Sequence, residues 1–109
     1  MTDNPQARLS IVAYKPKPGK EAELMSLTRE HVPYLRSIGL ATDRPHVIAT
    51  ANDGTVVEVF EWVEGGVEKA HAHSGLRELW SRYSEACDFV PLKTLQEAEM
   101  MFANFVPVN

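Results

Sequence analysis

The sequence predicts a single α+β domain in which two helices cover one face of a four-stranded antiparallel sheet. Short segments rich in β-branched and aromatic residues alternate with longer segments whose apolar residues recur every three or four positions. These segments follow one another in the order β-α-β-β-α-β. A chain of 109 residues has room for one hydrophobic core only.

A strand and a helix are expected first. Residues 9–14 favour a strand, and the prolines that follow end it because they donate no ladder hydrogen bond. The helix expected over residues 20–37 should be kinked or split by Pro33 and ended by Gly39. Its apolar stripe consists of Leu24, Leu27, His31, Leu35 and Ile38.

A β-hairpin and a second helical region are expected next. Residues 45–51 and 55–63 favour strands, and the Asn-Asp-Gly triplet between them tolerates the positive φ of a tight turn. The second helical region spans residues 67–87 and is expected to break at Ser74-Gly75.

The last part of the chain should supply the fourth strand. Pro91 should end the second helical region, residues 92–98 are compatible with a helical turn, and residues 100–106 favour a strand. This order of elements is typical of a ferredoxin-like fold, with both helices on one face of the sheet. The domain is expected over residues 8–109, after a flexible tail at residues 1–7.

Both faces of the predicted sheet are apolar. In the third strand the two faces carry Val56, Phe60 and Trp62 on one side and Val57 and Val59 on the other. The first strand alternates in the same way, and so does the strand expected at residues 100–106. Since the helices cover one face only, we expect a second copy of the chain to cover the other through an interface of about 2,000 Å². A wide apolar ligand site on that face is the alternative, and it is compatible with a dimer.

Composition argues against several kinds of partner. The net charge is -4 and the pI is near 5.5, with no basic stripe, so no nucleic-acid partner is expected. No run of 18 apolar residues occurs, so no membrane association is expected. The single cysteine, Cys87, and the polar N-terminal residues favour a cytoplasmic protein. The Glu-x-x-His spacing of di-iron sites occurs only once, at Glu68 and His71, so no metal is expected.

Two stretches resemble the antibiotic-biosynthesis-monooxygenase family. They are "YKPKPGKEAE" at residues 14–23 and "VFEWVEGGVEKAHAH" at residues 59–73, and the order of elements is similar over about residues 8–107. The resemblance implies a dimeric α/β barrel, a homodimer formed through the sheet face, and a pocket for a small aromatic ligand between sheet and helices. It also implies a cofactor-independent monooxygenase that acts on a phenolic or quinol-like substrate.

The candidate site residues come from the pocket that this resemblance implies. His71 is the candidate catalytic base, because an imidazole titrates near neutral pH. The candidate substrate-binding residues are His31, Tyr34, Trp62, His73, Trp80 and Tyr83. We expect Phe60 and Phe102 to be core residues, and Cys87 to be a small buried hydrophobe.

Two alternatives stay open at this stage. One is a non-catalytic ligand-binding or stress-related dimer that keeps the pocket but has no working base. The other is a haem-binding and haem-degrading protein with His71 as the axial ligand. Haem degraders of this fold carry an Asn on the first strand, where this sequence has Ser10, so the match to them is incomplete.

Overall fold

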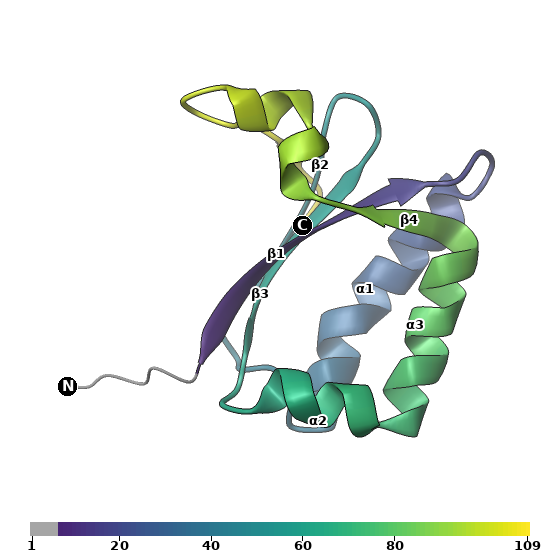
Figure 1. Ribbon diagram of the computed structural model, residues 1–109, viewed down its shortest axis with the longest axis vertical. Coiled ribbons are helices and arrows are strands. Elements are labelled where there is room, and N and C mark those ends of the chain that lie inside the picture. The colour runs from purple at the N-terminus through teal and green to yellow at the C-terminus, as the bar shows by residue number, and fades with distance from the viewer. Residues whose placement is uncertain (1–6) are drawn as a thin grey trace.

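The computed structural model describes residues 7–109 and has an antiparallel sheet packed against helices (Figure 1). The strands are β1 (Arg8–Pro16), β2 (Val47–Thr50), β3 (Val56–Trp62), β4 (Cys87–Val90) and β5 (Val106–Pro107). The helices are α1 (Glu21–Ser37), α2 (Gly66–Ala72) and α3 (Ser74–Ala86), with two 3-10 turns, η1 (Leu92–Thr94) and η2 (Gln96–Glu99). The tail expected at residues 1–7 lies outside the described residues, apart from Ala7.

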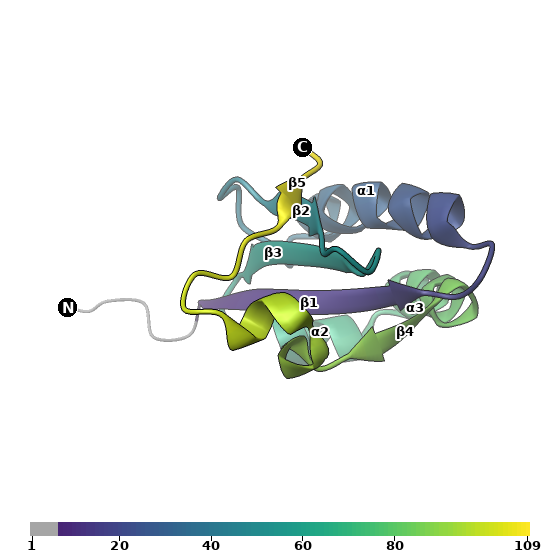
Figure 2. The same cartoon turned by 90° about the horizontal axis from the view of Figure 1, so that it is seen from above.

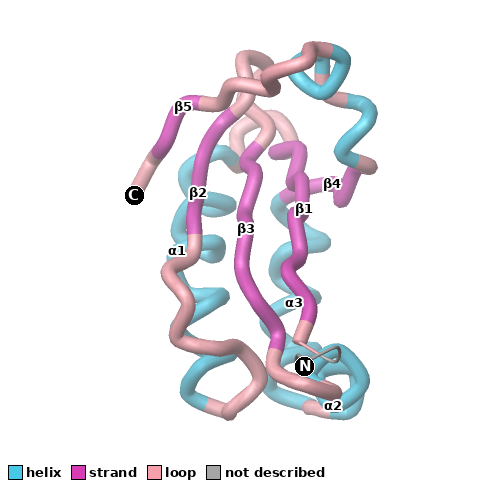
Figure 3. Tube along the Cα trace, turned by 90° about the vertical axis from the view of Figure 1, so that its left-hand side faces the viewer, coloured by secondary structure: helices cyan, strands magenta, loops and turns pink. Residues whose placement is uncertain are grey.

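The sheet contains five strands in the order β4-β1-β3-β2-β5, and every neighbouring pair is antiparallel (Figure 2). The three α-helices lie on the same face of this sheet (Figure 3). The α+β class and the antiparallel sheet are therefore confirmed, and the expected number of four strands is wrong. Within residues 7–109, no helix combines the length and the apolar character that a bilayer crossing requires.

The C-terminal strand assignments need correction. Residues 100–106 do not form a strand, since only Val106 within them is paired, as part of β5 with β2. The strand beside β1 is instead β4, which begins directly after α3 and places Phe89 opposite Tyr14. A four-residue strand that follows a helix without a turn has almost no local signal, because its pairing partner is distant in sequence.

The first helix is continuous through Pro33. Its inner face is buried from Leu24 to Leu35, which compensates for the one hydrogen bond that a proline cannot donate. Gly39 adopts a φ of 76°, and the amide of Leu40 donates to the carbonyl of Leu35, which closes the helix as expected. The break expected at Ser74-Gly75 lies one residue earlier, at the extended His73 that separates α2 from α3.

The main core lies between the sheet and the helices, and a second, smaller cluster lies on the outer sheet face. The 3-10 turns η1 and η2 cover part of that face, where Leu95 packs with Ala13 and Val57. This partial third layer was not expected from the sequence. The expectation that Phe102 is a core residue is wrong, because its side chain is 77% exposed, whereas Phe60 is buried.

Candidate active site

A cavity of about 360 Å³ opens between the inner face of the sheet and the helices. Strands β1 and β3 form one wall, and residues of α1, α2, α3 and β4 form the others. The lining residues are Ser10, Val12, Tyr14, His31, Phe60, Trp62, Val67, His71, Trp80, Ser84 and Phe89. Such an aromatic and apolar lining with a few polar groups is typical of a site for a small planar molecule.

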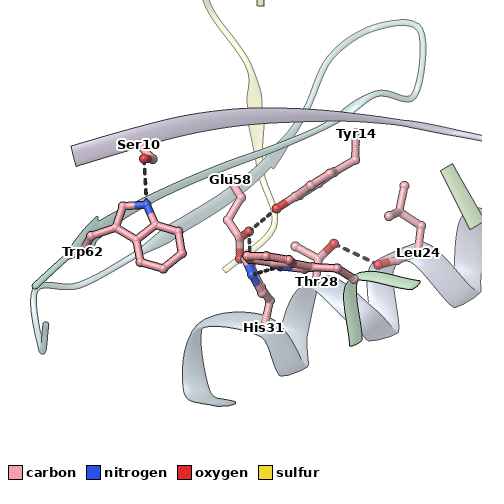
Figure 4. Close-up of polar contacts among 8 residues, drawn as sticks. Ser10, Tyr14, Leu24, Thr28, His31, Glu58 and Trp62 are labelled. Atoms are coloured by element: carbon pink, nitrogen blue, oxygen red, sulfur yellow. Dashed lines mark hydrogen bonds and ion pairs between the residues drawn. The ribbon is translucent and has the colours of Figure 1, made fainter. Parts of the chain in front are cut away.

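A buried hydrogen-bond network joins two lining residues of this cavity, Tyr14 and His31, to Glu58 (Figure 4). The Oε1 atom of Glu58 accepts from the Tyr14 hydroxyl at 2.8 Å and lies 2.9 Å from Nδ1 of His31. Glu58 is fully buried and His31 is only 3% exposed. A carboxylate with two strong donors is stabilised in a place where an isolated charge would be very costly.

The hydrogen bonds assign the tautomer of His31. The indole N–H of Trp80 lies 3.3 Å from Nε2 of His31, and an indole nitrogen can only donate. Nε2 must therefore carry the lone pair, which places the ring proton on Nδ1, from where it is donated to Glu58. A neutral imidazole held in this way by a carboxylate is the arrangement that general bases use.

Aromatic neighbours fix the orientation of the His31 ring. The rings of Phe60 and Tyr83 each contact it edge to face, with centroids 5.5 Å away. Burial and the nearby Glu58 carboxylate raise the pKa of Tyr14 and that of Tyr83 well above the ordinary value. Both phenols therefore stay neutral over the physiological pH range, and Tyr14 remains a donor to Glu58.

A second polar pair lies on the sheet wall of the cavity. The indole N–H of Trp62 donates to Oγ of Ser10 at 2.9 Å. This bond uses a lone pair of Ser10, so its hydroxyl hydrogen stays available to an acceptor in the cavity. A ligand with a carbonyl oxygen would thus find a donor on this wall of the cavity.

The structure places His71 differently from His31. His71 is exposed on α2 at the cavity wall, where its ring packs against Trp80 with centroids 5.4 Å apart. Within residues 7–109, no carboxylate or other hydrogen-bond partner orients the His71 ring. His71 therefore lines the site without the fixed geometry that His31 has.

Two of the expected ligand-binding residues lie away from this cavity. His73 is the N-cap of α3, and its Nδ1 atom accepts from the amide of Leu76 at 3.1 Å. The Tyr34 ring packs against His73 and over Gly75, where a Cβ would overlap the Tyr34 hydroxyl. Both side chains thus hold α1 and α3 together.

Of the six expected ligand-binding residues, His31, Trp62 and Trp80 line the cavity together with His71. Tyr83 is fully buried behind the His31 ring and is a core residue.

The most important residue missed by sequence reasoning is Glu58. Its signal was present, because strand alternation puts Glu58 on the same apolar, inward face as Val56 and Phe60. A carboxylate at such a position requires a buried partner. Tyr14 and Ser10 were missed for a different reason, since nothing local distinguishes them from ordinary strand residues.

The described residues offer neither a metal site nor a reactive thiol. Within residues 7–109, no three His, Cys, Asp or Glu side chains are grouped closely enough to hold a metal ion. Cys87 is buried as expected, and burial raises the pKa of its thiol to about 11. The thiol is therefore protonated and weakly nucleophilic at neutral pH.

Comparisons of the chain with models of protein families, with curated proteins and with solved structures found no match.

Proposed function

We propose that this protein is a cofactor-independent monooxygenase that acts on a small phenolic or quinol-like substrate in the cavity between sheet and helices. The observation that carries the proposal is the buried Glu58–His31 pair, which holds His31 in the wall of an aromatic cavity with its Nε2 atom against the indole of Trp80, another lining residue. The sequence stretches at residues 14–23 and 59–73 that resemble the monooxygenase family support the choice of reaction.

The proposed reaction needs only the substrate, dioxygen and a base. Nε2 of His31 takes the phenolic proton, and the ring carbon para to the oxygen of the phenolate forms a C–O bond with dioxygen. His31 returns the proton to the peroxide. The O–O bond then breaks as the C–H proton of that carbon leaves, which forms a quinone carbonyl and one water molecule. Dioxygen accepts four electrons in total, and one of its oxygen atoms stays in the quinone.

The protein contributes orientation, a base and a largely apolar site. Glu58 keeps the Nδ1 proton in place and stabilises the imidazolium that forms when Nε2 is protonated. Ser10 can donate to the second oxygen of the substrate. The apolar walls favour the neutral phenol on entry and keep water away from the peroxide.

His31 replaces His71 as the proposed base. Proton transfer within hydrogen-bonding distance needs a base whose ring is oriented, and the contacts of Glu58, Phe60 and Tyr83 orient His31. His71 stays in the proposal as a wall residue beside Trp80.

Oxygen uptake tests the proposed reaction. We expect a panel of 1-naphthols and phenols with hydrogen at the para carbon to include substrates that consume one dioxygen per molecule and yield the corresponding quinone and water, without hydrogen peroxide and with no added metal or cofactor. Tight binding without oxygen uptake would instead support the non-catalytic binding module. A Soret band after addition of hemin, lost in the His71→Ala variant, would support the haem-binding alternative.

The proposed assembly is a homodimer formed through the outer sheet face, as in a dimeric α/β barrel of ferredoxin-like domains. The strand order β4-β1-β3-β2 with helices on one face supports this architecture. The cross-strand row of Ile11, Val59 and Val47 lies in an apolar depression of about 500 Å³, which residues of η1, η2 and the C-terminal segment also line. Beside it, Met101 is 93% exposed. A second copy would bury these side chains together.

The Ile11→Glu variant tests the dimer. Ile11 is 51% exposed, so the charge is tolerated in one chain, but a dimer would bury it twice. We expect the dissociation constant to rise about 100-fold or more, measured by sedimentation of wild type and variant at micromolar concentration. Arg77→Glu, on the exposed side of α3, is the matched control and should stay dimeric. A wild type that sediments as a folded 12.2 kDa monomer would contradict the dimer.

We also propose a cytoplasmic location. The single cysteine is buried with a raised pKa and makes no disulfide, which suits a reducing compartment.

A further inference from the structure

The base of the proposed reaction is covered in this structure. The indole N–H of Trp80 occupies the one lone pair of His31, at 3.3 Å from Nε2. His31 is only 3% exposed, although it lines the cavity. A substrate hydroxyl can therefore reach Nε2 only if the indole of Trp80 gives up this position.

We propose, on the basis of the proposed function, that Trp80 is a displaceable cap on His31 that selects for ligands carrying an acidic hydroxyl. Such a ligand replaces the indole N–H with its own O–H, so Nε2 always has a donor. A ligand with an ether oxygen in the same place brings no hydrogen. It would leave Nε2 buried without a partner if it displaced Trp80.

The contacts of Trp80 suit a group that moves. Its hydrogen bond to His31 is longer than the 2.9 Å bond on the other side of the ring, and a phenolic O–H is a stronger donor than an indole N–H. The Trp80 side chain is half-buried, and its ring packs against His71, which is itself exposed. The buried contacts of α3 come from Leu76, Leu79, Tyr83 and Ala86, so the helix can stay in place while the indole rotates.

The cap makes a specific prediction for Trp80→Phe, measured with 1-naphthol and 1-methoxynaphthalene as a matched pair of probes. The variant keeps an aromatic ring but has no N–H, so a hydroxyl ligand no longer has to break a hydrogen bond. We expect the affinity for 1-naphthol to rise about threefold to tenfold. The affinity for 1-methoxynaphthalene should change less than twofold, since the ether does not displace the cap.

The indole signals of Trp80 and Trp62 give an independent readout, because these are the two tryptophans of the chain. In a nitrogen-15 correlation spectrum of the wild type, 1-naphthol should shift the Trp80 indole signal, and 1-methoxynaphthalene should leave it near its place. The Trp80→Phe variant assigns the signals. An unchanged Trp62 signal in that variant shows that the fold is intact.

Two results would overturn the cap. One is weaker binding of 1-naphthol to Trp80→Phe, which would make Trp80 an ordinary wall of the site. The other is a Trp80 indole signal that responds equally to both probes.

The His31→Gln variant separates this inference from the proposed function. If His31→Gln binds 1-naphthol as tightly as the wild type does, the proposed role of His31 is wrong. If His31→Gln binds 1-naphthol more weakly but Trp80→Phe binds it like the wild type, only the proposal that Trp80 is a cap is wrong.

Discussion

Replacing His31 with Gln is expected to lower turnover about 100-fold to 10,000-fold, the range that a general base contributes. Glutamine can keep a hydrogen bond to Glu58 and has a similar length, but its amide cannot accept a substrate proton at neutral pH. The decrease should appear mainly in kcat, with a smaller loss of binding, because the substrate hydroxyl loses the Nε2 acceptor while the apolar walls that hold its ring are unchanged. The measurement is the initial rate of oxygen uptake with the best phenolic substrate.

Comparison of His71→Ala with His31→Gln decides which of the two histidines is the base. His71 packs against Trp80 at the cavity wall, so its loss should weaken substrate binding and change KM more than kcat. We expect kcat to fall less than tenfold. If His71→Ala removes turnover and His31→Gln keeps it, the base is His71, and the Glu58–His31 pair is a structural element of the core.

Replacing Glu58 with Ala is expected to destabilise the fold by about 3–5 kcal/mol, because one partner of a buried hydrogen-bonded pair is removed. The variant leaves the Tyr14 hydroxyl and Nδ1 of His31 without their acceptor in a dry interior. For a domain of this size the melting temperature should fall by about 10–25 °C. Thermal unfolding followed by circular dichroism, at one fixed protein concentration, measures the change.

Two variants control for the stability effect. Glu58→Gln keeps an acceptor oxygen and the volume of the side chain, so we expect a smaller loss of about 1–2 kcal/mol. Glu64→Ala removes an exposed carboxylate near the end of β3 and should change stability by less than about 0.5 kcal/mol. Equal destabilisation by Glu58→Ala and Glu64→Ala would show that the network contributes nothing to the fold.

The sequence by itself determined the elements whose signals are local. Alternation of apolar residues placed Val12 and Tyr14 opposite Ile11 and Ala13, and the three-to-four spacing predicted α1 with His31 on its buried stripe. The turn before β3 followed from residues that tolerate positive φ, as Gly54 does at 92°. These features depend on neighbours a few positions away.

Only the tertiary structure decided the pairing of the short strands. β4 pairs with the far end of β1, and β5 pairs with β2, so each is a strand because an open sheet edge is available to it. Residues 100–102 have the composition of a strand but meet no such edge, and they remain exposed. The partial cover of the outer face by η1 and η2 likewise depends on where the chain returns.

The tertiary structure also decided which histidine has the geometry of a base. The sequence offers four histidines and gives no reason to prefer His31. The preference arises because His31 and Glu58 lie 27 positions apart, and Tyr14 and Glu58 lie 44 apart, yet all three side chains meet at one point in the core. These contacts between distant segments depend on how α1 packs against the sheet, and that packing cannot be predicted from local sequence patterns.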